Sequence, residues 1–327
     1  MLSDRIHRIA VPTPFPVGPV NVYLIEAERG GRPLLIDAGL ASAEAVLALE
    51  SGLAERGFAP RDIGAIILTH HHVDHAGGAR RLQRLCGARV FAHPLDHHWL
   101  ARDGRHPAVE KALAEAGLPR EALERLDSLY EEIVSYHEPL EVMEPLANGD
   151  VVPSGIGGLR VTETPGHTQG SLCLQAEDGT LFSGDTVLER ITPNAILDGA
   201  GEGRFRALPV YIRSLVRLSQ LRLGPILPGH GDPFPKLEPV LAKAYARYRE
   251  RGERILELLR PRPATVAEIG EALFGSSRPD QLFLVISEVY GNLDLLEEHG
   301  AVEVVAEHPL RYRAIGALGA DYPLSAS

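Results

Sequence analysis

Short apolar runs alternate with stretches of helical spacing through the first two thirds of the chain. The runs are rich in β-branched residues and bounded by glycine or polar residues, which is typical of strands. They lie at residues 20–25, 34–36, 65–68, 89–92, 159–163 and 172–175. Helical spacing is clearest after Ser42, where Val46, Leu49 and Leu53 recur, and it returns near residues 76–85. This alternation predicts a layered α/β domain.

Beyond residue 235 the pattern becomes mainly helical. Thr265 and Glu268 form a capping-box pattern that opens the second of three expected helices. A ribbon of two short apolar strands is expected after the last helix, between about residues 302 and 315. Three helices followed by a ribbon are typical of a winged-helix domain. The expected division of the 327-residue chain is residues 1–235 and residues 236–327.

A charged segment interrupts the first of these regions at about residues 100–140. Leu118, Leu123, Leu126 and Leu129 recur there at loosely helical spacing, which predicts inserted helices. The pattern is compatible with two placements of these helices. They either cover a substrate pocket or pack on the sheets, and the sequence does not choose between the two.

Composition narrows the class of protein. Hydrophobic residues make up 44% of the chain and charged residues 24%, which is ordinary for a globular protein. No apolar run approaches eighteen residues, and the first residues lack the basic-then-apolar pattern of a secretory leader. The sequence therefore predicts a cytoplasmic protein with no membrane partner. Cys86 and Cys173 lie far apart in apolar runs and are expected to be free thiols.

The formal net charge of -11 argues against broad attraction to phosphate backbones. The last expected helix also carries several acidic residues and no Lys or Arg, which does not suit a helix that enters a DNA groove. Nucleic acid is therefore a disfavoured partner, and a small-molecule substrate is expected. We expect the C-terminal region to pack on the first domain or to form a homo-oligomer.

One short segment directly after the strand at 65–68 is dense in metal-ligating side chains. Residues 69–75 read THHHVDH, which places imidazoles and a carboxylate at His70, His72, Asp74 and His75. Nitrogen and oxygen ligands at this density are typical of a zinc site. The alternative interpretation of this segment is a solvated polar turn with no metal. Further candidate ligands later in the sequence argue against it.

Three isolated residues offer those further ligands. Each follows an apolar run and lies among glycines, in the sequences PGHT, SGDT and PGHG. Glycine allows the backbone and a ligand to approach a crowded ion closely. A lone glycine-flanked His or Asp is usually only a turn residue, so their shared context carries the interpretation. The three residues are His167, Asp185 and His230.

This ordered set resembles the metallo-β-lactamase superfamily over about residues 1–235. Its members here are Asp37, the HxHxDH motif of residues 70–75, His167, Asp185 and His230. The resemblance implies an αββα sandwich with two metal ions. It implies that His70, His72 and His167 hold one metal. It further implies that Asp74, His75 and His230 hold the other, that Asp185 bridges both, and that Asp37 orients a ligand by a hydrogen bond.

Such a site predicts hydrolysis without a protein nucleophile. Two divalent ions, expected to be zinc with iron or manganese as alternatives, can share a bridging hydroxide, because metal binding lowers the pKa of water to about 7. We assign Asp74 a second role as the catalytic residue that orients this hydroxide. The ligands identify a type of reaction and leave the substrate open.

Several activities fit this ligand set. The chain is most similar to the glyoxalase-II-like branch of the superfamily, which implies a hydroxyacylglutathione-hydrolase-like enzyme acting on a thioester, ester or lactone. The C-terminal region lacks a basic cluster for glutathione carboxylates, so glutathione specificity is not expected. The alternatives are a phosphodiesterase or endoribonuclease and, less favoured, an iron-dependent sulfur dioxygenase. A metal-stabilised scaffold is the least favoured interpretation.

Other histidines near the motif are expected to have structural roles. His71 should point away from the metals, because neighbouring side chains of an extended segment face opposite sides. His93, His97 and His98 follow a strand, yet no carboxylate or thiolate nearby supports a third metal site. We expect them on a helix surface or a pocket wall.

Overall fold

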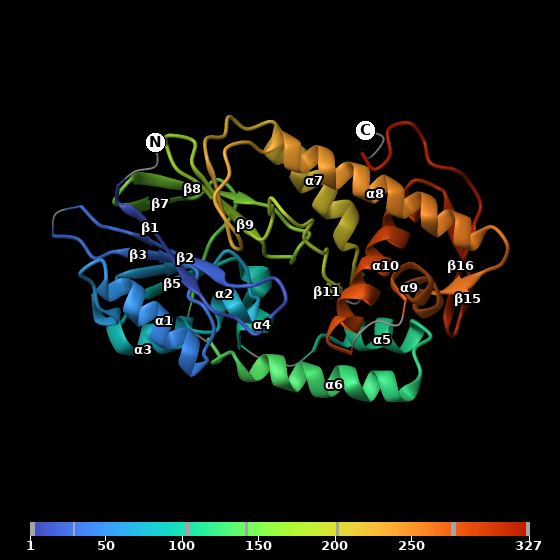
Figure 1. The fold of residues 1–327 in the computed structure, drawn as a ribbon, viewed down its shortest axis with the longest axis horizontal. Coiled ribbons are helices and arrows are strands. Elements are labelled where there is room, and N and C mark those ends of the chain that lie inside the picture. Colours follow the sequence, from blue (N-terminus) through green and yellow to red (C-terminus); the bar gives the residue numbers. More distant parts are fainter. Residues whose placement is uncertain are drawn as a thin grey trace.

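The computed structural model describes residues 4–28, 30–101, 105–140, 143–200, 203–275 and 279–324. Two β-sheets lie in the left part of Figure 1, with helices on their outer faces and a mainly helical region at the right. The architecture is the expected αββα sandwich, followed by a smaller C-terminal region of helices and short strands.

The first sheet has six strands whose spatial order follows the sequence. The strands are β1 (Ile6–Val11), β2 (Val20–Ile25), β3 (Leu34–Ile36), β4 (Ala65–Ile67), β5 (Arg89–Ala92) and β6 (Glu144–Pro145). Strands β1 to β3 pair antiparallel, whereas β3 to β6 are parallel. All residues of β2 are buried, which explains its continuous apolar pattern. Helices α1 (Ala43–Ala54) and α3 (Ala79–Cys86) cover the outer face of this sheet.

The second sheet has five strands in the order β13-β10-β9-β8-β7. Their bounds are β7 (Val151–Ser154), β8 (Gly157–Glu163), β9 (Leu172–Gln175), β10 (Leu181–Gly184) and β13 (Ile226–Pro228). Neighbours are antiparallel except β10 and β13. Apolar side chains from both sheets form the core between them, where the rings of Tyr23 and Phe182 meet edge to face at 5.3 Å. Helix α7 (Ala207–Ser219) covers the outer face of this sheet.

The remaining elements belong to the loops around the sheets, the inserted segment and the C-terminal region. The helices are α2 (Val73–Ala76), α4 (His97–Ala101), α5 (Pro107–Glu115), α6 (Arg120–Ser135), α8 (Glu238–Leu259), α9 (Val266–Phe274) and α10 (Leu282–Glu298). Short 3-10 helices lie at Pro60–Asp62, Pro94–Asp96 and Pro279–Gln281. The remaining strands are β11 (Asp198–Ala200), β12 (Gly203–Phe205), β14 (Ala264–Thr265), β15 (Val302–Glu307) and β16 (Leu310–Ala314).

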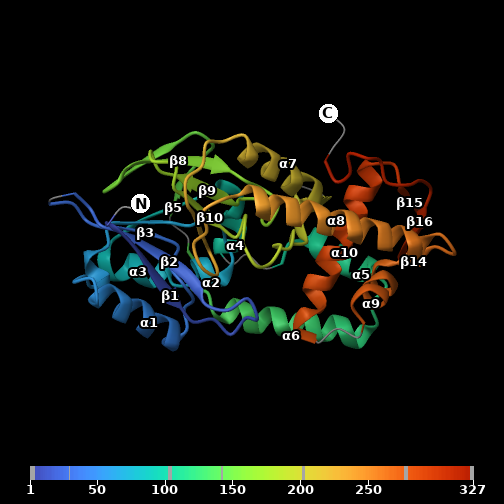
Figure 2. The ribbon, with the colours of Figure 1, turned by 45° about the horizontal axis from the view of Figure 1, so that its top comes forward.

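The inserted helices pack against the C-terminal region, and α10 lies between α7 and α5 (Figure 1 and Figure 2). The buried hydroxyl of Tyr290 on α10 donates a hydrogen bond to the Ala112 carbonyl of α5 at 2.7 Å. The Ala267 N–H donates to the Ala116 carbonyl at 2.8 Å. Neither placement considered from the sequence included this contact. The same hydrophobic cluster crosses residue 235, so the two expected domains share a core.

The C-terminal elements follow the expected order of three helices and a ribbon. The capping box is present: Thr265 Oγ1 accepts a hydrogen bond from Glu268 N–H at 3.1 Å, and the Glu268 carboxylate accepts one from Thr265 N–H at 2.7 Å. Strands β15 and β16 form the ribbon, and β14 adds a third strand in the order β14-β16-β15. The winged-helix assignment stays a prediction.

Two expectations from composition can be compared with the structure. Cys86 and Cys173 are both free thiols. Within the described ranges, no helix combines the length and the apolar character that crossing a bilayer requires.

A buried ion pair fixes α10 to the β11–β12 hairpin. Both terminal nitrogens of Arg204 contact the Asp294 carboxylate at 2.5 Å, and the Asp294 side chain is 3% exposed. We expect Arg204→Ala to lower the free energy of unfolding by about 3 kcal/mol, because it leaves a buried carboxylate without its main partner. Chemical denaturation would measure this loss. Arg206→Ala is the control, since Arg206 is 45% exposed and 3.6 Å from the same carboxylate. Equal losses in the two variants would contradict the prediction.

Candidate metal centre

The seven predicted ligands come from loops at the carboxyl ends of strands in both sheets. His70 and His72 lie in the loop after β4, and the short helix α2 carries Asp74 and His75. The other three follow β8, β10 and β13 by four, one and two residues, respectively, and they are His167, Asp185 and His230. Segments far apart in the sequence therefore meet where the two sheets open on the same side.

The structure brings all seven side chains together in overlapping groups. Three sets have ligand atoms within 4.8 Å of one another: His70 with His72 and His167, His70 with His75 and Asp185, and Asp74 with His75 and His230. In the first set, His72 Nδ1 lies 3.0 Å from His70 Nε2 and 3.0 Å from His167 Nε2. In the last, His230 Nε2 lies 3.2 Å from Asp74 Oδ2.

Asp185 lies between these groups. Its Oδ1 is 3.4 Å from His75 Nε2, and its Oδ2 is 3.7 Å from His167 Nε2. The same Oδ2 is 3.6 Å from His230 Nε2. One carboxylate is thus within reach of ligands from both the first and the last set, which is the position that a bridging ligand requires.

Hydrogen bonds on the outer side of the imidazoles fix how three of the rings face the centre. His75 Nδ1 donates to Asp37 Oδ2 at 2.7 Å, His167 Nδ1 to the Asn194 carbonyl at 2.7 Å, and His230 Nδ1 to the Pro19 carbonyl at 2.9 Å. Each bond leaves the Nε2 lone pair directed at the other ligands. Outer partners of this kind set the tautomer and orientation of metal-binding imidazoles.

Asp37 makes the hydrogen bond to a candidate ligand that the resemblance implied. Its carboxylate also accepts bonds from the Thr69 N–H at 2.8 Å and the Thr69 hydroxyl at 2.9 Å. Among the described residues other than glycine, Asp37 alone has a positive φ, at 63°. Such a conformation costs about 1–3 kcal/mol and persists only where its surroundings hold it. The loop after β3 is therefore held in place by its contacts with Thr69 and His75.

The candidate ligands are packed so closely that position 229 has room only for glycine. A Cβ atom there would lie 2.3 Å from Asp185 Oδ1 and 2.6 Å from His75 Cε1. Both distances are shorter than any non-bonded contact allows. The glycine expected to permit close approach at the PGHG motif is thus required at this position.

Several polar atoms in the centre lack hydrogen-bond partners among the described residues. His75 Nε2, His230 Nε2 and Asp185 Oδ1 are buried without one, although carboxylates or imidazoles lie nearby. Buried polar atoms are almost always paired, because leaving them unpaired is costly. Imidazole nitrogens and carboxylate oxygens facing one point are the donors that divalent cations such as zinc take. The residues present therefore fit metal ions.

The electrostatics differ between the two sides of the centre. Burial, reinforced by neighbouring imidazoles, lowers the pKa of His70 and His72 well below the usual value. Burial also lowers the pKa of His167, although Asp185 partly opposes it. For His75 and His230, burial would lower the pKa, but nearby carboxylates, Asp185 foremost, outweigh it and raise the pKa.

The pKa of Asp185 is lowered for the complementary reason. Burial favours its neutral form, but the attraction of His230 and His75 outweighs burial and keeps the carboxylate charged. The centre therefore has imidazoles of lowered pKa on one side and, beside Asp185 on the other side, imidazoles whose pKa the carboxylates raise. Neutral imidazoles and ionised carboxylates are the forms that bind metals.

His71 lies outside all three groups, as expected from its place in the motif. Its ring stacks on Trp99 with centroids 5.1 Å apart, and its Nδ1 lies 3.2 Å from Asp96 Oδ1. Asp96 Oδ1 also accepts a hydrogen bond from Gly170 N–H at 3.0 Å. This contact with the loop that carries His167 was not predicted, because nothing local to Asp96 marks it in the sequence.

In the described part of the chain, no group of potential metal ligands includes His93, His97 or His98. His93 Nε2 lies 3.3 Å from a Glu163 carboxylate oxygen, and His93 Nδ1 accepts a hydrogen bond from Leu95 N–H. His97 and His98 lie on α4, and the His98 ring is next to Trp99. These positions agree with the expected structural role.

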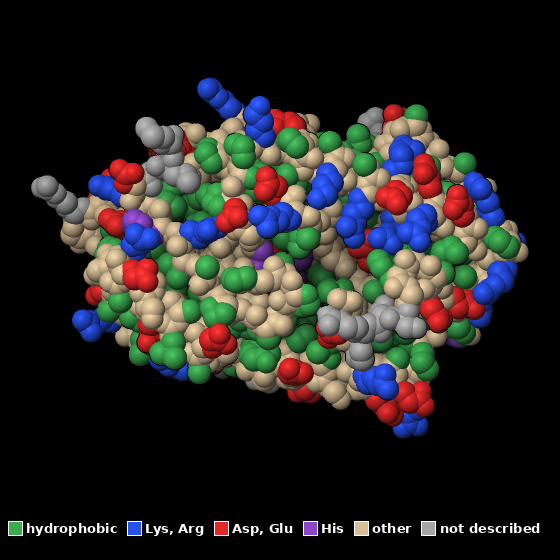
Figure 3. Space-filling model, viewed as in Figure 1, with side chains coloured by type: hydrophobic (Ala, Val, Ile, Leu, Met, Phe, Trp, Pro, Cys, Tyr) green, Lys and Arg blue, Asp and Glu red, His purple; other side chains and the backbone are tan. Residues whose placement is uncertain are grey.

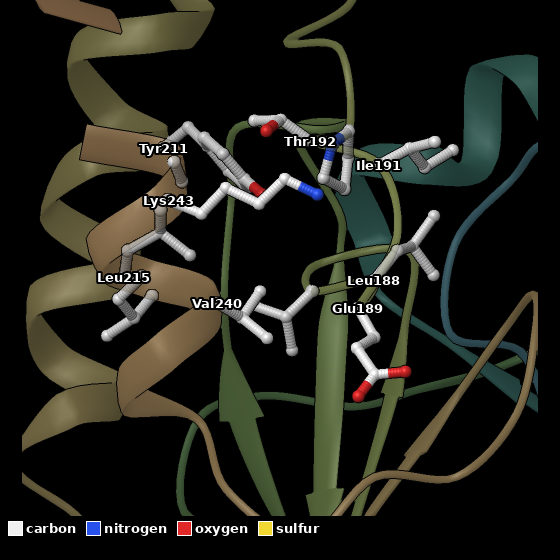
Figure 4. Close-up of a pocket in the computed structure, with 12 residues that line it drawn as sticks. Leu188, Glu189, Ile191, Thr192, Tyr211, Leu215, Val240 and Lys243 are labelled. Carbon is white, nitrogen blue, oxygen red and sulfur yellow. The ribbon is translucent and has the colours of Figure 1, made fainter. Parts of the chain in front are cut away.

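The molecular surface is hollowed in places. Figure 3 shows His side chains in a hollow on the face drawn there, between the sandwich and the C-terminal region. A separate small pocket lies between the loop after Asp185 and helices α7 and α8, and none of the seven candidate ligands lines it. Figure 4 shows its largely apolar lining, with Lys243 extended across it. That pocket therefore belongs to helix packing and not to the candidate metal centre.

Comparison with known proteins agrees with this geometry. The sequence pattern of the metallo-beta-lactamase superfamily matches residues 15–230. The probable metallo-hydrolase YqjP of Bacillus subtilis is 32% identical over 310 residues, covering 92% of this chain and 95% of that protein. The structure of a metallo-beta-lactamase family protein from Thermus thermophilus superimposes with a TM-score of 0.84 at 30% identity. The match covers 96% of this chain and 100% of that one.

A further relative has a more specific name. The atrochrysone carboxyl ACP thioesterase of Aspergillus fumigatus is 27% identical over 292 residues, covering 84% of this chain and 75% of that protein. The match to the superfamily pattern spans the strands and loops that carry all seven candidate ligands. This chain belongs to the metallo-beta-lactamase superfamily, whose members bind divalent metals, and it is a hydrolase of that superfamily.

Proposed function

We propose that the chain is a dinuclear metal-dependent hydrolase that acts on a carboxylic thioester, ester or lactone. The observation that carries this proposal is the position of Asp185, within 3.7 Å of candidate ligands on both sides of the centre. A single metal site would not need a carboxylate placed between two groups. Zinc is the proposed metal, because the donors are imidazoles and carboxylates, and iron and manganese accept the same donors.

In this proposal each ligand has a defined place. His70, His72 and His167 would hold one ion, Asp74, His75 and His230 would hold the other, and Asp185 would serve both. When bound, two divalent ions supply Lewis acidity and lower the pKa of water, so that hydrolysis can proceed near neutral pH. Asp37 keeps His75 in the tautomer whose Nε2 faces the centre, and the Asn194 carbonyl does the same for His167.

Asp74 is the proposed catalytic residue. Its Oδ2 lies 3.2 Å from His230 Nε2, so the carboxylate is inside the candidate metal centre. A carboxylate at this place could accept a hydrogen bond from an attacking water and orient it toward a carbonyl carbon. The side chain is 10% exposed, which limits competition from bulk water.

The thioester is the favoured substrate within this class. The named thioesterase among the relatives supports it. The alternatives are a phosphodiesterase or endoribonuclease and a sulfur dioxygenase. Acidic residues of α10 do not favour a nucleic-acid partner: Glu288, Asp294 and Glu297 lie within 2.5–3.4 Å of Arg251, Arg204 and Arg206. This pairing fits a packing role for the winged-helix-like region.

Removal of the bridging carboxylate should disrupt both metal positions. We expect Asp185→Ala to lose metal and hydrolytic activity together, because the remaining ligands no longer share a charged partner. His71→Ala is the comparison, since His71 lies outside the ligand groups, and it should keep both properties to within a few-fold. Elemental analysis and turnover on the same samples measure the two properties. Equal effects in the two variants would overturn the ligand assignment.

The hydrogen bond from His75 to Asp37 should tune metal affinity without supplying a ligand. We expect Asp37→Asn to weaken the binding of one ion by about 10–100-fold, the usual effect of changing an outer partner of a metal-binding imidazole. Competition with a chromogenic chelator would measure it. Asp232→Asn is the control, because this carboxylate is 63% exposed and pairs with Arg8 instead of an imidazole. Unchanged affinity in Asp37→Asn would remove Asp37 from the account.

A substrate panel separates the proposed activities. Acyl thioesters should be hydrolysed faster than phosphodiesters and RNA, and a chelator should abolish the activity. The test is the initial rate on each substrate at equal concentration, with and without added zinc. Faster cleavage of RNA, inhibited steeply by salt, would instead favour the nuclease, because phosphate contacts release counterions.

A further inference from the structure

The segment formed by the described residues 194–200 and 203–206 lies between the candidate ligand loop and α10. It begins nine residues after Asp185 and contains the β11–β12 hairpin. One side of the segment contacts the loop that carries His167, and the other side contacts α10 of the C-terminal region. The segment therefore connects α10 to the ligand loop through hydrogen bonds on both of its sides.

Contacts on the side of the metal centre hold His167 at two points. The His167 ring donates from Nδ1 to the Asn194 carbonyl at 2.7 Å, and the His167 carbonyl accepts from Ile196 N–H at 3.2 Å. Two residues further on, Gln169 Nε2 donates to Asp198 Oδ2 at 2.9 Å. Both the backbone and the ring plane of His167 thus depend on where this segment lies.

Contacts on the other side attach the same segment to α10. Asn194 Nδ2 donates to the Leu284 carbonyl at 2.8 Å, and Leu197 N–H donates to Ser287 Oγ at 3.1 Å. Further along, the Arg204–Asp294 pair fixes β12 to the same helix. Ser287 and Asp294 are 1% and 3% exposed, so their attachments are buried, whereas the bond from Asn194 to Leu284 lies at the exposed edge of the interface.

We propose that Asn194 is a positioning residue that sets the orientation of His167 according to the position of α10. Its side chain bonds to the helix, and its own carbonyl bonds to the imidazole, so a single residue joins the two. The C-terminal region then contributes to the metal centre without supplying a ligand. This inference rests on the proposed function, in which His167 is a metal ligand.

A purely structural role for Asn194 makes a different prediction. If its side chain only stabilised the interface, its removal would change the stability of the protein and leave the affinity of each metal unchanged. A positioning role instead predicts that the affinity for one metal ion changes. The ion held by His70, His72 and His167 should bind more weakly, while the ion held by Asp74, His75 and His230 keeps its affinity.

The test uses the full-length protein freed of metal and titrated with Zn²⁺ against a chromogenic chelator. Asn194→Asp keeps the shape of the side chain but removes the donor to Leu284, and Asn194→Ala removes the donor without adding charge. We expect the affinity for one of the two ions to fall by about tenfold in both variants, the low end for outer partners of a ligand. With Co²⁺ in place of Zn²⁺, the visible absorption of one ion should change and that of the other should persist.

Two further variants separate the possible results. Arg213→Ala removes an exposed contact of α7 with Glu298 on α10, 3.0 Å long, and should alter the thermal midpoint without altering either affinity. His167→Ala should lose one ion. If it does, while both Asn194 variants bind as the unmodified protein does, the positioning role is wrong and the proposed function stands. If His167→Ala keeps both ions at full affinity, the ligand assignment itself is wrong.

Discussion

Five imidazoles and two carboxylates are packed together where the two sheets meet, and several of their inward atoms have no hydrogen-bond partner among the described residues. Groups of this kind are costly to bury unless something pairs them. Metal cations would supply the missing interaction, because each unpartnered nitrogen or oxygen directs a lone pair or a negative charge toward the same region. The requirement to place these seven side chains around one centre explains much of the surrounding structure, including the positive φ of Asp37 and the glycine at position 229.

The C-terminal region is connected to this centre by packing and ion pairs as well as by the chain itself. Its helix α10 shares a hydrophobic cluster with α7 and α5, and its acidic residues pair with arginines of α8 and of the segment from 194 to 206. The acidic residues of α10, which argue against a nucleic-acid partner, therefore stabilise the packing of this helix. In the proposed arrangement, the same segment carries the carbonyl that orients His167, so packing at a distance from the ligands bears on the geometry of the site.

Local patterns in the sequence predicted a layered α/β domain and marked the candidate ligands, whereas the αββα sandwich and the grouping of ligands around two metals came from the resemblance to the superfamily. The apolar runs at 65–68 and 172–175 became β4 and β9, and the ligands follow strands because glycine-rich turns place them there. Strand β1 was missed because His7 and Arg8 interrupt its apolar pattern, and β14 is only two residues long. The packing of the inserted helices on α10 joins residues far apart in the chain, so no local pattern could show it. Asn194 acts through a backbone carbonyl, which every residue type carries, and therefore left no signal.

The central claim is that the seven side chains surround two metal ions, and anomalous X-ray diffraction from crystals grown with zinc tests it most directly. At the zinc absorption edge, the account predicts two peaks in the centre. One should lie against His70, His72 and His167, the other against Asp74, His75 and His230, with Asp185 beside both. No peak in the centre, or one peak held by other residues, would contradict it.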